Sequence, residues 1–312
     1  MLHNCGMANK RLMLLDTASL YFRAFYGVPT SVVAPDGTPV NAVRGLMDFI
    51  SRLVTDHRPT DLIAAWDDDW RPEFRVAAIP SYKAHRVAEE ADPELDGETV
   101  PDELLPQVRL IEDLLRYAGI ARLGMPGYEA DDVIGSLASQ TNVPVFVVTG
   151  DRDLFQLVDD DQPIRVLYTA AKGVGNAEII DDAAVIERYG VHAREYAEFA
   201  LLRGDPSDGL PGVRGIGEKT AASLIRDYGD IGSLVAAAED DSSTLKPGVR
   251  KNLLAGREYI AVAGPVVQVA REIDLPTLPT HPADADALIA LAATWGLQSP
   301  LDRLSEAMGW QL

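Results

Sequence analysis

Three short apolar segments, each ending at an acidic residue, constrain the fold of this chain most strongly. They run from Arg11 to Asp16, from Asp61 to Asp67 and from Pro144 to Asp151. Segments of this length and composition are typical of strands buried in a parallel sheet. Helical patterns lie between them, at residues 40–55, 101–117 and 129–139. The alternation predicts a doubly wound α/β fold, in which functional residues gather at the carboxyl ends of the strands.

Acidic residues are expected to converge at these strand ends. Further acids open the helix at residue 129, flank Arg152, and precede a glycine-rich turn near residue 210. The nine carboxylates of this set are Asp16, Asp67, Glu129, Asp131, Asp132, Asp151, Asp153, Asp205 and Asp208. So many carboxylates repel one another unless cations lie among them, although acids in the first turn of a helix often serve only the helix dipole. The set predicts two or more divalent ions of the kind that promote attack of water on a phosphodiester.

The glycine-rich turn follows directly after the last two acids and leads into a helix predicted over residues 221–228. Its residues include Gly212, Gly215, Gly217, Lys219 and Thr220. Backbone amides at such a turn bind phosphate groups, and the pattern resembles a helix-hairpin-helix, which holds one strand of a duplex without reading its sequence. A G-x-G-x-x-G nucleotide loop is the competing interpretation, but that spacing and a preceding strand are both missing.

The charge of the chain limits how nucleic acid could bind. The 312 residues carry 28 basic and 48 acidic side chains, a formal net charge of −20, which argues against a protein that coats nucleic acid by charge alone. Phosphate contacts must therefore be local. One candidate surface combines basic side chains with an aromatic ring. Its residues are Arg71, Arg75, Tyr82, Lys83 and Arg86. The alternative is an ordinary amphipathic helix with a basic outer face.

Cysteine and histidine usage argues against other kinds of site. The single cysteine, Cys5, has no partner for a disulfide, and the five histidines show no metal-ligand spacing. The first residues lack the features of a secretory signal, and no apolar stretch reaches the ~20 residues of a membrane helix. We therefore expect a cytoplasmic protein whose start is either Met1 or Met7.

The longer motifs resemble those of the bacterial 5′-3′ exonuclease and flap endonuclease family, which is similar to the 5′-nuclease domain of DNA polymerase I. They occupy residues 15–16, 22–25, 74–75, 81–86, 126–132, 149–157 and 204–221. The resemblance implies a PIN-like, resolvase-like nuclease core at residues 1–180, with an arch at about residues 70–105. It also implies a helical DNA-binding region at residues 181–312, with a helix-three-turn-helix at about residues 200–230. No polymerase-like segment follows, so we expect a free-standing protein.

The resemblance further implies roles for individual residues. Asp205 and Asp208 would hold the ion more distant from the reacting phosphate, and the other seven acids would lie near the closer ion. The candidates for stabilising transition-state charge are Lys83, Arg86 and Arg23. Arg75 and Tyr82 would contact DNA. After the second strand, the position next to the strand favours Asp67 as the ligand, whereas counting back from Phe74 selects Asp68.

The expected activity is hydrolysis of DNA phosphodiesters at 5′ flaps and 5′ ends during replication and repair, with Mg²⁺ or Mn²⁺ as the cofactor. K⁺ is a candidate accessory ion at the glycine-rich turn. We expect a monomer that acts on DNA with a 5′ flap or single-stranded 5′ end, and RNA primer ends are a further candidate substrate. Two alternatives stay open: a PIN-type RNase, and a non-catalytic DNA-junction-binding protein, which would gain little from nine converging carboxylates.

Overall fold

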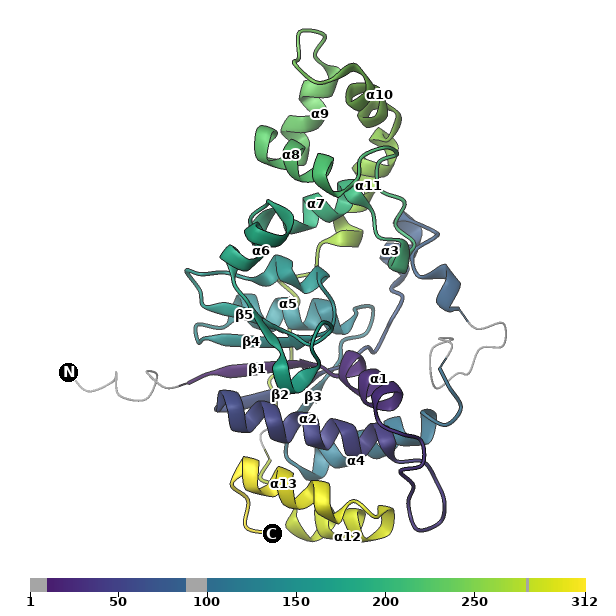
Figure 1. Cartoon of the computed structure of the whole chain (residues 1–312), viewed down its shortest axis with the longest axis vertical. Helices are drawn as coiled ribbons and strands as arrows, with labels where there is room; N and C mark the ends of the chain where they lie inside the picture. Colours follow the sequence, from purple (N-terminus) through teal and green to yellow (C-terminus); the bar gives the residue numbers. More distant parts are fainter. Residues whose placement is uncertain (1–9, 88–99, 279–280) are drawn as a thin grey trace, which may run out of the picture.

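A six-stranded sheet occupies the centre of the molecule (Figure 1). The computed structural model describes residues 10–87, 100–278 and 281–312. The strands are β1 (Leu12–Asp16), β2 (Asp61–Ala65), β3 (Ala121–Leu123), β4 (Val145–Thr149), β5 (Ile164–Tyr168) and β6 (Glu178–Ile180). Their spatial order is β3-β2-β1-β4-β5-β6, and only β6 runs antiparallel to its neighbour. The predicted doubly wound, mainly parallel sheet is confirmed, with the three predicted strands β1, β2 and β4 at its middle.

Side chains of the central strand alternate between two apolar cores, as the two-residue period of a strand requires. Leu12 and Leu14 face a core shared with α5 (Ala130–Gln140). Met13 and Leu15 face a second core, shared with α2 (Asn41–His57) and α4 (Leu105–Tyr117). A strand buried on both faces explains why the sequence shows a continuous apolar run rather than alternation.

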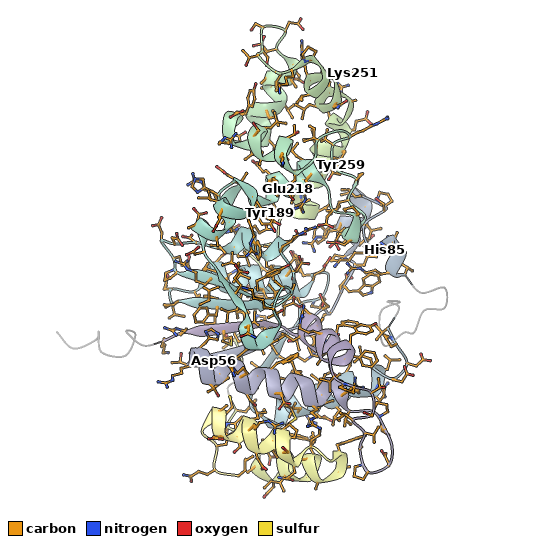
Figure 2. All side chains as sticks on the ribbon, in the orientation of Figure 1. Asp56, His85, Tyr189, Glu218, Lys251 and Tyr259 are labelled. Atoms are coloured by element: carbon orange, nitrogen blue, oxygen red, sulfur yellow. The ribbon has the colours of Figure 1, made fainter. Side chains whose placement is uncertain are left out.

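A helical region extends from one side of the sheet and forms the narrow end of the molecule (Figure 1). Its helices are α6 (Asp182–Tyr189), α7 (Tyr196–Arg203), α8 (Glu218–Tyr228), α9 (Ile231–Glu239), α10 (Pro247–Ala255) and α11 (Arg257–Val267). Figure 2 shows Glu218, Lys251 and Tyr259 in this region and His85 on the side of α3 (Glu73–Ala78). The helix predicted from residue 221 is α8, which begins earlier because Gly217 is its N-cap.

The chain then returns from α11 to the core through residues 268–273, a segment that we call the strap. The strap lies along α5, where the Ser136 Oγ donates to the carbonyl of Ala270 (3.0 Å) and the Gln140 Nε2 donates to that of Ile273 (2.9 Å). Two final helices, α12 (Ala285–Trp295) and α13 (Gln298–Met308), contribute to the apolar core of α2. The helical region is therefore joined to the core at both of its ends.

The predicted arch falls only partly within the described residues. Of its residues, α3 and the short 3₁₀ turn Ala84–Arg86 are placed, but residues 88–99 lie outside the described ranges. α1 (Thr17–Gly27), which directly follows β1, is also placed. Across those ranges, no helix is long and apolar enough to cross a membrane.

Candidate active site

The carboxyl ends of the three central strands open into a pocket of about 430 Å³. β1 pairs with both β2 and β4, so the residues that follow these strands meet at one edge of the sheet. The carboxylates lining the pocket are Asp16, Asp67, Glu129, Asp131 and Asp151. The cations lining it are Lys83, Arg86 and Arg152. The pocket thus contains five of the nine predicted acids and two of the three predicted catalytic cations.

Asp16 ends β1 and caps α1. Its carboxylate accepts hydrogen bonds from the Ser19 amide (3.2 Å) and the Thr149 hydroxyl (2.6 Å). Burial, together with the charges of Asp67 and Asp151, raises the pKa of Asp16 to about 7, although the Thr149 hydrogen bond lowers it. A cation that enters the pocket would stabilise the ionised form of this carboxylate.

The structure separates the two candidate acids after β2. The Asp67 Oδ1 accepts a hydrogen bond from the Ala130 amide at the start of α5 (2.8 Å), and its side chain lines the pocket. Asp68 instead pairs with Arg122 (3.2 Å) and packs against Gly124, where an added Cβ would lie 2.3 Å from the Asp68 carboxyl carbon. Asp67 is therefore the acid that faces the pocket.

Asp131 and Asp153 are held in an unfavourable electrostatic environment. Burial raises the pKa of Asp131, and the nearby charges of Asp16 and Asp151 add to the effect. Burial likewise raises the pKa of Asp153, with Asp151 the strongest of its acidic neighbours. The Asp153 Oδ1 is buried and has no hydrogen-bond partner among the described residues. An unpartnered buried acceptor of this kind calls for a cation or a donor from outside the chain.

Glu129 connects the pocket to the base of the arch. The Tyr82 hydroxyl donates to its Oε1 (2.7 Å), and the Lys83 Nζ donates to its Oε2. Burial alone would lower the pKa of Lys83, but the Glu129 charge raises it well above the ordinary value, so Lys83 stays a cation. Tyr82, predicted to contact DNA, is 4% exposed here, and its hydroxyl is hydrogen-bonded to Glu129.

Asp132 and Arg75 form a buried pair. The Arg75 guanidinium binds both Asp132 carboxylate oxygens (2.7 Å each), lies 3.1 Å from the Glu129 Oε1, and donates to the carbonyl of Val266 (3.2 Å). Asp132 also accepts from the Ala270 amide (2.8 Å) and is fully buried. Arg75, predicted to contact DNA, is 3% exposed. The pair ties α3, α5 and the strap together.

Asp205 and Asp208 form an outer group beside the pocket, and each is paired with an arginine. Asp205 accepts from Arg152 (2.8 Å) and, more weakly, from Arg203 (3.4 Å), while Asp208 accepts from Arg86 (2.9 Å). Burial raises the pKa of Asp205, but the hydrogen bonds from Ser207 and Arg152 outweigh it and the net pKa is lowered. The sequence analysis did not predict that Arg152 pairs with Asp205, although Arg152 lies between two of the predicted acids, Asp151 and Asp153.

Residues 81–83, at the base of the predicted arch, are hydrogen-bonded to the loop that carries Asp205 and Asp208. The Lys83 amide donates to the carbonyl of Asp208 (2.9 Å), and the Ser81 hydroxyl donates to that of Gly209 (2.8 Å). Gly209 has a φ of 71°, and a Cβ added there would lie 2.1 Å from the backbone carbonyl oxygen of Ser81. Only glycine allows this approach, which sets the position of Lys83 relative to the outer acids.

Arg23, the third predicted catalytic cation, lies on α1 next to Gly150, at the edge of the pocket. It is half-buried, and its buried Nε has no hydrogen-bond partner among the described residues. Its guanidinium is thus close to the pocket without lining it.

The donor set fits a hard divalent cation, although the acids are not preassembled around one. Within residues 10–87, 100–278 and 281–312, no three Asp, Glu, His or Cys side chains are already arranged to hold a metal ion. Four of the predicted acids are held by cations of the chain instead, Glu129 by Lys83, Asp132 by Arg75, Asp205 by Arg152 and Asp208 by Arg86. The carboxylates repel one another, and the atoms that they offer to a metal are all oxygens, the ligands that Mg²⁺ or a similar ion prefers.

The glycine-rich turn presents an open surface at the start of α8. Gly217, the N-cap residue, has open space where a side chain would begin, and Lys219 is exposed beside it. Thr220 is half-buried. Gly212 has a φ of 64°, and a Cβ added there would lie 2.5 Å from the Gly204 nitrogen. Gly215 has a φ of 78°, and a Cβ added there would lie 2.7 Å from the Asn252 Nδ2. The turn therefore requires glycine for both conformation and space.

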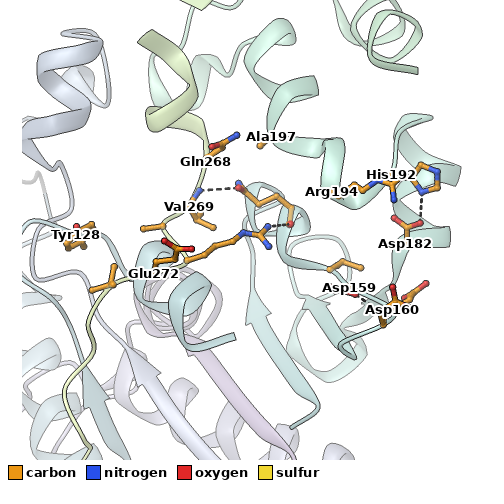
Figure 3. Close-up of a pocket in the computed structure, with 16 residues that line it drawn as sticks. Tyr128, Asp159, Asp160, Asp182, His192, Arg194, Ala197, Gln268, Val269 and Glu272 are labelled. Atoms are coloured by element: carbon orange, nitrogen blue, oxygen red, sulfur yellow. Dashed lines mark hydrogen bonds and ion pairs between the residues drawn. The ribbon is translucent and has the colours of Figure 1, made fainter. Parts of the chain in front are cut away.

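A larger cavity, of about 830 Å³, lies between the strap and the residues around α6 (Figure 3). The nine predicted acids do not line it. Some of its polar groups are paired with each other or with the strap: Asp182 binds the His192 ring (2.7 Å), and the Gln156 Oε1 accepts from the Val269 amide (3.1 Å). The smaller pocket at the strand ends is therefore the candidate active site.

Comparison with known proteins identifies two family models along the chain. The 5′-3′ exonuclease N-terminal resolvase-like domain matches residues 11–190, and the 5′-3′ exonuclease C-terminal SAM fold matches residues 191–286. A 5′-3′ exonuclease of Streptomyces coelicolor is 60% identical over 296 residues, covering 94% of this chain and 98% of the relative. That of Mycobacterium tuberculosis is 51% identical, covering 95% and 97%. DNA polymerase I of the same bacterium is 38% identical, but the match covers 96% of this chain and only 32% of the polymerase.

Solved structures share the fold at low sequence identity. The T5 D15 protein co-crystallised with metal ions has a TM-score of 0.64 at 18% identity, covering 96% of this chain and 99% of the other. The catalytic core of Rad2 in complex with DNA substrate has a TM-score of 0.58 at 18% identity, covering 96% and 91%.

Proposed function

This chain belongs to the 5′-3′ exonuclease family, and from that premise we propose that it is a structure-specific 5′ nuclease that hydrolyses DNA phosphodiesters at 5′ flaps and 5′ ends. One observation carries the proposal: five carboxylates and three cations line a single pocket at the carboxyl ends of the central strands. The substrate would be chosen by its shape and its single-stranded 5′ end, in replication and repair. Processing of RNA primer ends, a cytoplasmic location and a monomeric state belong to the same proposal.

The metal sites follow from the two groups of acids. The inner position would use Asp16, Asp67, Glu129, Asp131, Asp132, Asp151 and Asp153, and the outer position Asp205 and Asp208. Mg²⁺ or Mn²⁺ ions bound there would supply an activated water and stabilise the leaving oxygen, without a covalent intermediate. Solved relatives by fold, such as the T5 D15 protein, were crystallised with metal ions, which supports this part of the proposal.

The cations of the pocket would act on the substrate itself. Lys83 is held at the pocket by Glu129, and a scissile phosphate would offer its ammonium a second anionic partner. Arg86 lines the same pocket and its side chain is 37% exposed, so it can reach a phosphate from the outer side. Together with Arg23, they would stabilise the charge that develops in the transition state.

The glycine-rich turn would anchor the duplex, with K⁺ as a candidate accessory ion. Exposed amides around Gly217 and the Lys219 ammonium are suited to consecutive phosphates of one strand. Only three residues separate Asp208 from Gly212. This short link would fix the distance between the anchored duplex and the site of cleavage.

Substituting Lys219 with alanine should weaken binding to flap DNA and lower the slope of log affinity against log salt by about 1, because one phosphate contact is lost. The single-turnover cleavage rate at saturating enzyme should change little. Fluorescence anisotropy over a series of salt concentrations measures the slope. Lys10→Ala is the matched control, because Lys10 is exposed just before β1, at the opposite edge of the sheet from the pocket. Unchanged affinity for Lys219→Ala would remove the anchor from the proposal.

A cleavage assay tests the function directly. A 5′-labelled flap DNA and an RNA of matched structure are each incubated with the protein in Mg²⁺, in Mn²⁺ or in chelator. We expect cleavage of the DNA with either ion and none in chelator. Cleavage of the RNA alone would make the chain a PIN-type RNase. Binding of the flap without cleavage under every condition would make it a junction-binding protein.

A further inference from the structure

The inner and outer carboxylates are balanced in different ways. Among the inner acids, Asp16 and Asp67 accept hydrogen bonds from uncharged groups, namely the Ser19 amide, the Thr149 hydroxyl and the Ala130 amide. The outer acids accept from arginines: Asp208 from Arg86, and Asp205 from both Arg152 and Arg203. Of the inner acids, Glu129 pairs with Lys83 and Arg75, and Asp132 pairs with Arg75, whereas an arginine pairs with each of the two outer acids.

Both oxygens of Asp205 are engaged in this arrangement. The Arg152 Nη2 lies 2.8 Å from Oδ2, and the Arg203 Nη2 lies 3.4 Å from the same atom. The Oδ1 accepts from the Ser207 amide (2.9 Å) and from the Ser207 hydroxyl. A divalent ion can use Asp205 as a ligand only if one of these partners withdraws.

Of the two arginines, Arg152 is the one that is able to withdraw. The Arg203 side chain is 10% exposed, donates to the carbonyl of Gly204 (3.1 Å) and stacks on Phe199. The Arg152 side chain is 39% exposed, and within the described part of the chain its guanidinium hydrogen bonds to Asp205 alone. It also lines the active-site pocket. Rotation toward that pocket would free Asp205 without breaking another contact.

Asp153 supplies an independent indication that a cation is missing beside Arg152. Its buried Oδ1 has no partner among the described residues, and the acids that act on it electrostatically include Asp151, Asp208 and Asp205. An ion near this oxygen would therefore lie close to the outer acids.

We propose that Arg152 is an internal counterion that occupies the outer cation position, and that a divalent ion binds there only by displacing it. The inner position therefore fills first. The displaced guanidinium moves toward the pocket, where a DNA phosphate is its next anionic partner. Substrate and outer ion thus favour each other's binding, so that the site is fully loaded when DNA is present. This inference rests on the proposed function, because it takes both metal positions from it.

Binding of Mn²⁺ alone, followed by electron paramagnetic resonance of the free ion, tests the inference without reference to catalysis. The wild type should bind one ion tightly and a second one weakly, and Asp205→Asn should lose the second. Arg152→Gln should tighten the second site at least about tenfold, since one positive charge next to it is gone, and leave the first unchanged. Arg152→Lys should return the second site to weak binding. Arg122→Gln, which breaks the pair with Asp68 outside the pocket, is the control and should match the wild type.

A second arm adds a flap DNA whose scissile linkage is an uncleavable methylphosphonate next to normal phosphates. The affinity of the second ion should rise about tenfold in the wild type and should not change in Arg152→Gln. Second-site affinity that is the same in Arg152→Gln and the wild type would overturn the inference while leaving the nuclease proposal intact. Failure of the wild type to bind any Mn²⁺ would instead overturn the metal sites of the proposed function itself.

Discussion

Substituting Arg75 with alanine should lower the free energy of unfolding by about 3–5 kcal/mol, the cost of leaving a buried carboxylate without its cation. Arg75 is 3% exposed and binds Asp132 through two 2.7 Å hydrogen bonds, while contacting Glu129 at 3.1 Å. Burial by itself would lower the pKa of Arg75, but the charges of Glu129 and Asp132 raise it above the ordinary value. The guanidinium is therefore charged at any pH at which the protein folds.

Urea unfolding at neutral pH measures this effect. Arg75→Lys should recover part of the loss, because an ammonium keeps the charge but cannot bind both Asp132 oxygens in the same geometry. The control is Arg52→Ala, which removes an exposed pair with Asp56 on α2 and should change stability by less than about 1 kcal/mol. If Arg75→Ala costs no more than Arg52→Ala, the buried pair does not hold α3, α5 and the strap together.

Asp131→Asn should change activity and stability in opposite directions. Cleavage of flap DNA should fall at least about 10³-fold, because the metal ions would supply several kcal/mol of charge stabilisation in the transition state. In chelator, the melting temperature should rise by about 2 °C or more. Burial and the charges of Asp16 and Asp151 raise the pKa of Asp131, so its ionised form is unfavourable in the metal-free fold and a neutral amide relieves the repulsion.

Single-turnover kinetics and thermal unfolding with and without Mn²⁺ check both parts. Asp113→Asn is the control, because Asp113 pairs with Arg116 on the exposed side of α4 and should leave cleavage unchanged. A loss of activity together with a loss of metal-free stability would show that Asp131 is a structural residue. Full activity of the variant would remove Asp131 from the proposed inner site.

The sequence predicted the centre of the fold better than its edges. β1, β2 and β4 are buried on both faces and therefore appear as uninterrupted apolar runs. β3 and β6 have three residues each, and β5 includes Arg165, so their sequences are too short or too polar to predict a strand. The positions of Asp16, Asp67 and Asp151 in the pocket followed from the central strands alone.

The sequence did not predict the surroundings of Arg75 and Tyr82, because segments distant in the sequence bury them. Arg75 and Tyr82 recur among bases and polar residues, which favours a surface helix. The structure instead buries them against α5 and the end of α11, through contacts with Asp132, Glu129 and Val266. Contacts that join residue 75 to residue 266 depend on the tertiary fold and leave no periodic signal in the sequence.

The return of the chain to the core also determines how the protein can be shortened. A truncation after residue 190, where the first family model ends, would remove α12 and α13 as well as helices α7 to α11. Buried leucines of α12, of α13 and of the turn between them, Leu288, Leu297, Leu301 and Leu304, cover the same apolar core as Leu46 and Ile50 of α2. The truncated chain would expose that face and aggregate. A shortened chain that keeps the sheet and its cores therefore requires an internal deletion that rejoins α6 to the strap, since residues 285–312 follow the helical region in sequence but contribute to the core of α2.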